Sequence, residues 1–422
     1  MGKQLNVGLL GCGSVGRGLV ELVGRNEGLL RERTGVELNI SKILVRDLKK
    51  ERAGVDRGLL TTEPAKVLEN GCDLVVELVG GLEPARTFIH RALAGRKHVV
   101  TANKSLLAAE GYSLLQAAAI QNVRFGFEAS VCGGIPIVRA LKTGLVGNRF
   151  ESLLGIFNGT CNYILTRMSE DGCDLKDALK DAQSKGFAEA DPSLDIEGHD
   201  AAQKLKILAE LAFHARLPLN AVQVEGITKL TSDDVRSARE MGCVIKHVGT
   251  ARLHGDSVSV EAAPVMLPIG HQLAGVRDEN NAVLVQGDAV GEMLFSGKGA
   301  GSLPSATAVL SDIVEIASSH TPQSPLPSRK LCAVSPSFTG KHYIRIPVAE
   351  PSVIGAITTM FERDGIGVAR ASATWAKGAS TFSQVKVLTH ACDTGKMNKL
   401  LASVKAQGLT KGDFVLLRVG SA

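Results

Sequence analysis

An acid and a base stand four residues apart in a segment that predicts a helix. At about 100° per residue, Asp200 and Lys204 fall on the same side of that helix as its apolar residues. Those apolar residues are Ile207, Leu208 and Leu211. The polar residues expected on the opposite side are His199, Gln203, Lys206 and Glu210. Burying charges on an inward face costs folding free energy, unless the charges are paired or take part in binding or catalysis.

An acidic loop precedes this helix and bears on two interpretations. A buried ion pair at spacing i,i+4 is common in helices and needs no function. The loop, however, adds three carboxylates directly upstream: Glu189, Asp191 and Asp195. Together with the nucleotide motif described next, these carboxylates favour a functional site over an ion pair alone.

A glycine-rich turn near the N-terminus joins a predicted strand, Leu5 to Leu10, to a predicted helix. Its residues are Gly11, Cys12, Gly13, Ser14, Val15 and Gly16. In such a GxGxxG motif, Gly11 makes the tight turn, Gly13 lets a pyrophosphate approach the backbone, and Gly16 allows close packing of helix and strand. The amides of the helix N-terminus then hold the phosphates. The motif predicts a dinucleotide site. The alternative is a glycine-rich turn in another α/β protein.

The second predicted strand, Leu38 to Val45, ends at Arg46 and Asp47. In NAD-binding folds an acidic residue here binds the ribose 2′-hydroxyl, whereas an arginine accommodates the 2′-phosphate of NADP. Arg46 therefore favours NADP, and Asp47 leaves NAD open. The spacing from Gly16 to Arg46 is longer than usual, which predicts an extended first helix.

Further strands of a parallel sheet are predicted at Leu74 to Val79 and at Val99 to Val100. Ligands of such sheets bind at the carboxyl ends of the strands. Lys104 follows the second of these strands and is expected near a bound nicotinamide, unless it is a solvated loop lysine. Glu128 ends another strand and precedes Gly133 and Gly134, which predicts either a site for a monovalent cation or a sharp crossing between domains.

The middle of the chain predicts a second, largely antiparallel sheet. Its strands are expected at residues 152–157, 244–254, 257–267 and 282–287, with helices over about 160–185 and 198–215. A glycine-rich turn at 297–301 precedes a helix, Ser305 to Ser318, which is expected to return to the nucleotide domain.

The C-terminal part begins after a stretch rich in Pro and Ser, which has the composition of a linker. Strand and helix patterns then alternate in the order βαββαβ. The predicted segments are 343–348, 352–363, 368–375, 381–389, 394–407 and 414–419.

Composition excludes several classes of function. The chain has 422 residues and a net charge of +5 without a dense basic tract, and only 4% of its residues are aromatic, so nucleic-acid binding has little support. It contains no apolar run of membrane-spanning length and no signal-peptide pattern. Its eight cysteines are scattered without ligand-like spacing, which favours reduced thiols in a cytoplasmic protein and argues against zinc.

With these segments in order, the chain resembles homoserine dehydrogenase over essentially its full length. The matching stretches are GLLGCGSVG, TANKSLLA, FEASVCGGIPI, GIFNGTCNYIL, GFAEADPSLDIEGHDAAQKL and GKGAGSLPSATAVLSDI. The resemblance implies reversible, NAD(P)H-dependent reduction of L-aspartate 4-semialdehyde to L-homoserine, in the biosynthesis of threonine, methionine and isoleucine. Other readings are another NAD(P)-dependent oxidoreductase of amino-acid metabolism, such as a reductase of the lysine pathway, and a non-catalytic nucleotide sensor.

The resemblance also implies roles for particular residues. Lys204 resembles the proton donor to the aldehyde oxygen, and Lys104 the second active-site lysine. The residues implied in substrate binding are Glu189, Asp200, Asp195 and Thr160. Those implied in cofactor binding are Gly11, Gly13, Ser14, Val15, Gly16, Arg46, Lys104, Gly186 and Gly301. Glu128, with the carbonyls of Val131, Gly133 and Ile135, resembles a site for sodium or potassium.

The implied fold class is α/β in three domains. A Rossmann-type dinucleotide-binding domain is expected at 1–134 plus about 302–320, and an α+β substrate-binding and dimerisation domain at 135–301. A linker at 321–340 leads to a domain at 341–422 that resembles the amino-acid-sensing ACT module. The module implies threonine feedback or a role in assembly alone, within a homodimer or homotetramer.

The chain departs from the family at three positions. Phe187 stands where many relatives have tyrosine, so a hydroxyl contact there is absent. Leu194 replaces an acid that some relatives carry. Ser352 occupies a position where many ACT modules have a glycine that lets the effector approach the backbone, which puts threonine sensing in doubt.

Overall fold

The computed structural model describes residues 3–69, 71–218, 220–319, 331–334, 338–348, 350, 352–374 and 383–420. These residues form two compact units. The first contains residues 1–150, 203–220 and 281–332, and the second contains 151–202, 221–280 and 333–422. The units group the chain differently from the three expected domains, whose boundaries stay a prediction.

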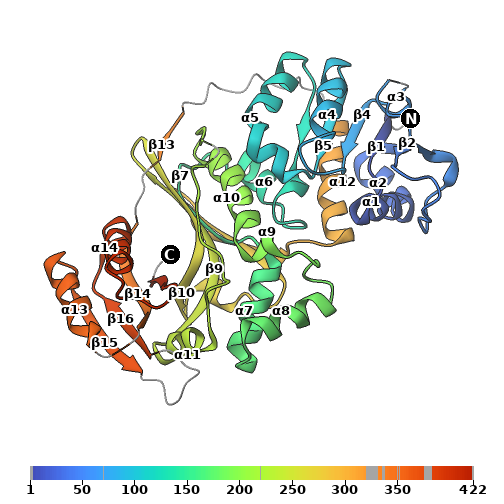
Figure 1. Cartoon of the computed structure of the whole chain (residues 1–422). Coiled ribbons are helices and arrows are strands. Elements are labelled where there is room, and N and C mark those ends of the chain that lie inside the picture. The colour runs from blue at the N-terminus through green and yellow to red at the C-terminus, as the bar shows by residue number, and fades with distance from the viewer. Residues whose placement is uncertain are drawn as a thin grey trace. The chain divides into compact units, whose positions relative to one another are not determined.

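The first unit contains the parallel sheet that the N-terminal sequence predicts (Figure 1). Its strands lie in the order β3-β2-β1-β4-β5-β6, the order of a Rossmann-type nucleotide-binding sheet. Their bounds are β1 Lys3–Leu10, β2 Val36–Leu44, β3 Leu60–Thr61, β4 Leu74–Glu77, β5 His98–Thr101 and β6 Phe125–Gly126. The central strands β4 and β5 are short apolar runs, as expected where both faces of a parallel sheet are buried, whereas β2 alternates polar and apolar residues.

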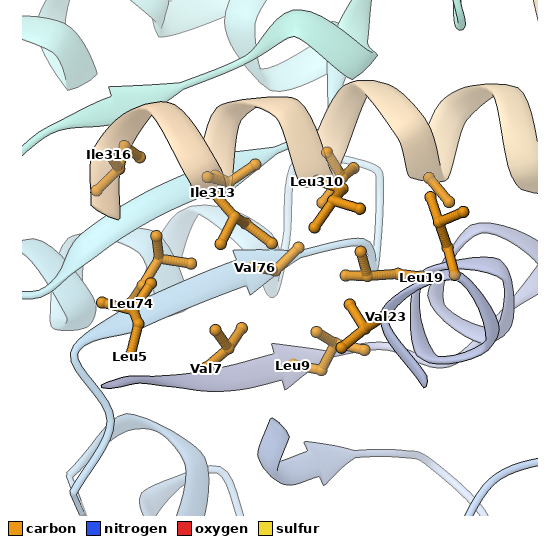
Figure 2. Close-up of a cluster of buried hydrophobic side chains, with 14 of the residues drawn as sticks. Leu5, Val7, Leu9, Leu19, Val23, Leu74, Val76, Leu310, Ile313 and Ile316 are labelled. Atoms are coloured by element: carbon orange, nitrogen blue, oxygen red, sulfur yellow. The ribbon is translucent and has the colours of Figure 1, made fainter. Parts of the chain in front are cut away.

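The expected helix at the end of the nucleotide fold, α12 (Ser302–Ser318), packs on this sheet. Figure 2 shows Leu310, Ile313 and Ile316 of α12 against the strands β1 and β4. Leu19 and Val23 of α1 (Ser14–Arg25) complete this side of the core. A segment nearly three hundred residues downstream is therefore part of the nucleotide fold.

The extended first helix was a wrong prediction. The segment forms α1 and a separate helix α2 (Glu27–Thr34), divided at Asn26, whose φ of −112° and ψ of 15° leave the helical region. Gly24, Asn26 and Gly28 are all poor helix formers, which explains the break. The other helices of this unit are α3 Ala65–Leu68, α4 Ala85–Ala94, α5 Lys104–Ile120 and α6 Ile137–Arg139.

In the second unit, strands predicted for the middle sheet and strands predicted for the C-terminal module form one sheet, in the order β7-β9-β10-β18-β14-β16-β15. Their bounds are β7 Phe150–Ile156, β9 Cys243–His254, β10 Ser257–Pro268, β18 Val415–Val419, β14 Thr339–Val348, β16 Ser383–Thr389 and β15 Val368–Thr374. Three short strands pair at its margins: β8 Gln223–Val224, β13 Ala333–Val334 and β17 Cys392–Asp393.

The helix expected over 160–185 forms as two, α7 (Gly159–Asp171) and α8 (Leu175–Ser184). Gly172, at a φ of +68°, ends α7 in the left-handed conformation that glycine adopts readily. Two further helices of this region are α9 Ser193–Ile196 and α11 Ser232–Glu240. The helix α10 (His199–Ala212) begins in the second unit and continues into the first. The strand expected at 282–287 forms as β11 (Asn280–Gly287), and an unexpected strand, β12 (Gly291–Lys298), pairs with it.

The C-terminal elements follow the predicted order βαββαβ (Figure 1). Two helices, α13 (Val353–Arg363) and α14 (Thr394–Ala406), pack on one face of the strands β14 and β16 and reach Leu416 of β18. Neighbouring strands in the order β18-β14-β16-β15 are antiparallel. The last residue of one predicted strand, Trp375, and the first two residues of the next, 381–382, lie outside the described residues. Most of the predicted linker also lies outside them.

Candidate active site

A cavity of about 840 Å³ lies over the carboxyl ends of the parallel strands in the first unit. Gly11 and Gly13 line it, together with Arg46 and Asp47. A Cβ at Gly16 would come within 2.7 Å of the Gly11 carbonyl oxygen, which accounts for the predicted close packing. A Cβ at Gly13 would meet nothing within 4 Å, so this part of the turn is open to a ligand. Ser14 and Val15 begin α1. The cavity therefore fits a dinucleotide.

Three cations line this cavity, and the sequence predicted a role only for Arg46. Arg46, Lys50 and Arg52 all contribute to its wall. One guanidinium nitrogen of Arg52 donates to the carbonyl oxygens of Asp47 (3.0 Å) and Lys50 (2.8 Å), which holds the loop closed. The Asp47 carboxylate accepts the Lys49 amide at 2.7 Å and is turned into its own loop. The arrangement suits a phosphate group.

The buried carboxylate of Glu77 organises the next strand ends. One of its oxygens accepts the amides of Val79 (2.7 Å) and Gly80 (2.9 Å). The other accepts the hydroxyl of Thr101 at 2.6 Å. An acid at the end of an apolar strand was the sequence signal for this residue, and sequence reasoning missed it. The contacts join the ends of β4 and β5.

Asn103 continues this network to the predicted lysine. Its amide hydrogen is donated to the Thr101 hydroxyl at 3.0 Å, and its side chain donates to the Gly81 carbonyl at 2.7 Å. The Asn103 side-chain oxygen also accepts the Leu106 amide at 3.1 Å and so caps α5. Lys104 is the first residue of α5 and is half-buried. Its backbone position is therefore fixed from two strands.

The segment of Lys204 meets the segment of Lys104 within the first unit. The Ser105 hydroxyl donates to the Gln203 side-chain oxygen at 3.2 Å. Ser105 follows Lys104 and Gln203 precedes Lys204, and both lysines are half-buried. Two segments about a hundred residues apart are thus brought side by side, as the functional hypothesis requires.

The prediction that one side of α10 is polar and exposed was wrong for two residues. Lys206 and Glu210 are buried, with only 6% and 9% of their surface exposed. Their charges are paired at 2.7 Å, and Glu210 also accepts the Leu217 amide at 2.8 Å. The helix is covered on more than one side, and the pairing offsets the cost of burying the two charges.

Three of the predicted substrate-binding residues form one cluster in the second unit. Asn158 donates its side-chain amide to Asp195 at 2.7 Å and to Asp200 at 2.8 Å. The Thr160 hydroxyl lies 2.7 Å from the Phe187 carbonyl oxygen and 3.1 Å from Asp195. Sequence reasoning missed Asn158, which also caps α7 through the Cys161 amide. Two carboxylates held together in this way suit an ammonium group.

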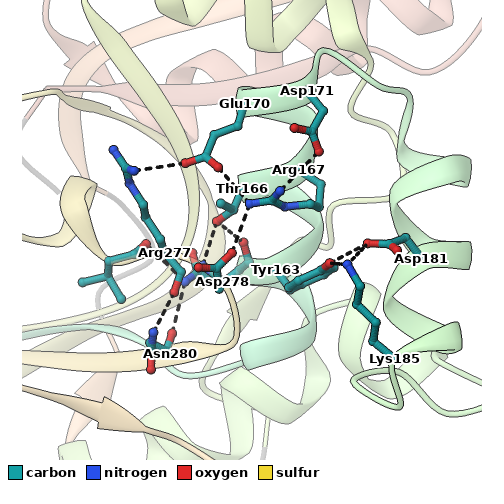
Figure 3. A network of polar contacts seen from close by, with 12 residues as sticks. Tyr163, Thr166, Arg167, Glu170, Asp171, Asp181, Lys185, Arg277, Asp278 and Asn280 are labelled. Carbon is teal, nitrogen blue, oxygen red and sulfur yellow. Dashed lines mark hydrogen bonds and ion pairs between the residues drawn. The ribbon is translucent and has the colours of Figure 1, made fainter.

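The remaining predicted residue, Glu189, lies in the loop after α8 and is exposed. A network on α7 and α8 supports this loop (Figure 3). The Tyr163 hydroxyl donates to Asp181 at 2.5 Å and accepts the Lys185 ammonium at 2.6 Å. The Tyr163 ring packs on Phe187, with 4.9 Å between ring centroids. Gly186, at a φ of +76°, makes the turn out of α8.

The neighbouring part of the same network fixes a second loop to α7 (Figure 3). Arg167 pairs with Glu170 at 2.8 Å and with Asp278 at 3.1 Å. Thr166 accepts the Asp278 amide at 3.2 Å. The helix that carries Thr160 is therefore held at both ends.

Glu128 occupies a buried turn of the first unit, where burial raises the pKa of its carboxyl. Its two oxygens accept the amides of Val138 (2.8 Å) and Arg139 (2.7 Å). Gly133 adopts a φ of +49°, and a Cβ there would lie 2.6 Å from the Gly299 backbone. A cation site formed by Glu128 and the carbonyl oxygens of Val131, Gly133 and Ile135, a donor set that would suit a hard cation, stays a prediction. Within the described residues, no group of three or more His, Cys, Asp or Glu could hold a metal ion.

Gly301 is the last glycine of the turn that precedes α12 and has a φ of +118°. Gly299 in the same turn lies against Asn281, whose side chain leaves no space for a Cβ at that position.

Among the helices of the described ranges, none combines the length and apolar character that a membrane crossing needs.

Comparison with known proteins identifies the family of this chain. Residues 11–128 match the model of the NAD-binding domain of homoserine dehydrogenase, and residues 136–314 match the model of homoserine dehydrogenase itself. The homoserine dehydrogenase of Bacillus subtilis is 37% identical over 420 residues, covering 95% of each chain.

Solved structures agree with the sequence comparison. A homoserine dehydrogenase from Thiobacillus denitrificans has a TM-score of 0.91 at 38% identity and covers 99% of this chain and 98% of its own. A hyperthermophilic archaeal homoserine dehydrogenase mutant, in complex with NADPH, has a TM-score of 0.63 at 26% identity, over 74% of this chain and 97% of its own. The chain belongs to the homoserine dehydrogenase family of NAD(P)-dependent oxidoreductases.

Proposed function

We propose that this homoserine dehydrogenase reduces L-aspartate 4-semialdehyde with NADPH and that Lys204 donates the proton to the aldehyde oxygen. The observation that carries the proposal is the hydrogen bond between Ser105 and Gln203, which joins the segments of Lys104 and Lys204 in the unit that contains the nucleotide fold. Bound NADPH supplies the hydride that the aldehyde carbon accepts.

The residues around that step have distinct roles in the proposal. Negative charge develops on the aldehyde oxygen, and a nearby ammonium stabilises that charge and gives up a proton. Lys204 has this role, and Lys104 adds positive charge close to it. Asp200, Asp195 and Glu189 bind the substrate ammonium, and Thr160 orients Asp195 through the contact at 3.1 Å.

The test of the proton donor is homoserine oxidation by Lys204→Met. Loss of a general acid–base group lowers kcat by about 10²- to 10⁴-fold. The affinity for NADP, measured by fluorescence titration, should stay unchanged. Lys66→Met, in an exposed ion pair with Glu63 of the same unit, is the control. Near-normal turnover of Lys204→Met would contradict the assignment.

We propose NADP as the preferred cofactor, with NAD as an alternative that Asp47 leaves open. Support comes from the three cations in the wall of the nucleotide cavity and from the turn of Asp47 toward its own loop. The archaeal relative in complex with NADPH is consistent with this preference. In the nucleotide turn, Gly11, Gly13, Ser14, Val15 and Gly16 hold the pyrophosphate. Gly186 and Gly301 are proposed as further cofactor contacts.

A sodium or potassium ion is proposed at Glu128 and the carbonyl oxygens of Val131, Gly133 and Ile135. The support is the oxygen donor set and the left-handed turn that Gly133 permits. Activity measured in sodium, in potassium and in a bulky organic cation at equal ionic strength tests this site. Equal rates in all three would exclude a functional role for the ion.

The C-terminal βαββαβ segment, 341–422, is proposed to be an ACT module, on the basis of the order of its elements. Whether it binds threonine is tested by activity of the full chain against rising threonine. A curve that stays flat, also in Ser352→Gly, leaves only a role in assembly.

A homodimer or homotetramer in the cytoplasm is also proposed. All eight cysteines are free thiols, as a reducing compartment requires.

A further inference from the structure

One face of the C-terminal sheet lies against α11 instead of α13 and α14. Tyr343 and Arg345 of β14 point to this face, and both contact Asp234 of α11, at 3.0 Å and 2.8 Å. Gln384 of β16 donates to Asp233 at 2.6 Å. These contacts cover the central strands β14 and β16. The edge strand β15 is exposed along its whole length.

The uncovered part of this face is the floor of a cavity of about 320 Å³. Its floor comprises Arg370, Ser372 and Thr374 of β15 and Lys386 of β16, which are on one face because side chains alternate along a strand. Arg236 and Glu240 of α11 contribute to its wall. Three elements thus direct cations and hydroxyl groups into one space.

The charges of this lining are unbalanced. Arg236 pairs with Asp233, and Glu240 is the one carboxylate among the lining residues. Arg370 and Lys386 are further cations, of which Lys386 lies 4.0 Å from the Asp233 carboxylate that already pairs with Arg236. Arg370 makes no ion pair with another described residue. The excess of positive charge favours an anionic ligand.

Lys386 gives an independent reason to expect such a ligand. Only 15% of its side chain is exposed, and burial lowers the pKa of its ammonium, while the charges of Asp234 and Glu240 oppose this shift and those of Arg236 and Arg345 add to it. Within the described residues its ammonium donates one hydrogen bond, to the Ser237 hydroxyl at 3.0 Å, and the nearest carboxylate oxygen, of Asp233, is 4.0 Å away. An ammonium has three donors, so further N–H groups are left for the cavity.

We propose that this cavity binds a small oxyanion, a phosphate or a carboxylate compound, at a site separate from the nucleotide cavity. Arg370 binds two oxygens of the anion through its planar guanidinium, Lys386 binds a third, and Ser372 and Thr374 donate their hydroxyls. The volume of about 320 Å³ accepts an anion with a short carbon chain as well as inorganic phosphate. The anion balances the positive charge beside α11 and bridges β15 and that helix.

The test is calorimetric titration of the full chain with inorganic phosphate and, separately, with citrate. The protein is first saturated with NADP so that the phosphate positions of the nucleotide cavity are filled, and ionic strength is held constant with chloride. Saturable binding of at least one of the two anions is expected, and which of them binds more tightly identifies the class of ligand.

Two variants locate the binding. Arg370→Gln, an exposed substitution, should weaken binding by about tenfold or more because a hydrogen-bonded charge is lost. Lys386→Met should do the same, and its thermal unfolding is measured beside it to show that it folds. Arg363→Gln changes an exposed arginine that pairs with Asp364 elsewhere in the same module, and is the matched control.

Saturable binding that Arg370→Gln weakens and Arg363→Gln leaves unchanged supports the site. Three results would overturn it: absence of saturable heat with both anions, equal affinity of wild type and Arg370→Gln, or equal weakening by Arg363→Gln. The last result would mean that the anion responds only to the net charge of the module.

Discussion

The hydroxyl of Ser105 lies 3.2 Å from the side-chain oxygen of Gln203, in helices that begin with Lys104 and contain Lys204. The bond links the first turn of α5, which Asn103 caps, to α10. Neither residue has a role in the proposed chemistry, but each is bonded in sequence to a lysine that has one. The contact therefore joins the two helices beside the residues that carry the lysines.

The first prediction concerns this contact. Ser105→Ala and Gln203→Leu should each lower kcat by about tenfold, because small displacements of a catalytic group are costly. The double variant should be no worse than either single variant, since both remove the same bond. Gln116→Leu on the exposed side of α5 is the control. Additive losses in a double-mutant cycle would show that the two side chains act separately.

A second prediction concerns the choice of nucleotide. Arg46→Ala removes a cation from the wall of the cavity and spares Arg52, whose guanidinium holds the loop. The KM for NADP should rise by about tenfold or more, because a charged hydrogen bond to the 2′-phosphate is lost. The KM for NAD should change little. Arg57→Ala, nearby in the chain but outside the cavity wall, is the control. Equal effects on both nucleotides would place Arg46 elsewhere on the cofactor.

A third prediction concerns the buried ion pair of α10. Glu210→Ala leaves Lys206 buried without its partner and also frees the Leu217 amide. The free energy of unfolding should fall by about 3–5 kcal/mol. Glu225→Ala breaks the exposed i,i+4 pair with Lys229 and should cost at most about 1 kcal/mol. Urea denaturation followed by circular dichroism measures both, and similar losses would show that burial of the pair is unimportant.

A fourth prediction concerns stability at acidic pH. Burial lowers the pKa of both His247 and His342 from 6.5 to about 4. Between these pH values the two histidines bind protons in the unfolded chain but not in the folded protein. The free energy of unfolding therefore falls as the pH falls from 6.5 to about 4. Urea midpoints across that range should therefore drop.

In His247→Gln and His342→Gln this acid-dependent loss should be smaller, whatever the stability of each variant at neutral pH. Glutamine keeps a donor for the Glu225 carbonyl, which the His247 ring contacts at 3.0 Å. His199→Gln, at an exposed histidine, should retain the slope of the wild type. An unchanged slope in both buried variants would mean that other groups cause the acid instability.

Most of the parallel sheet could be predicted from the sequence because its strands end at a polar or glycine-rich turn, as at Leu10 and Gly11. The two-residue strand β3 was not predicted. The position of Lys104 followed from the same rule. Glu77 carried a signal of this kind, as an acid at the end of an apolar strand, but its partner Thr101 did not follow from it. Asn158 could not be predicted in this way, because its importance comes from partners distant in the sequence, such as Asp195.

The polar side of α10 shows a second limit of sequence reasoning. A helical wheel assigns one inward face, and Lys206 was expected outside it. A helix covered on several sides has no such face, and its charges are tolerated because they find partners one turn away. The break at Asn26 is different, since weak helix formers at residues 24, 26 and 28 already indicated it.

The helix α10 begins in one unit of the molecule and continues in the other, with Asp200 before the boundary and Lys204 after it. Four residues of α-helix advance by about 6 Å. Because an α-helix has a fixed rise per residue, the backbone interval between these two positions is a property of α10 alone and does not depend on a loop. An insertion or deletion between residues 200 and 204 would therefore change both the interval and the relative direction of the two side chains.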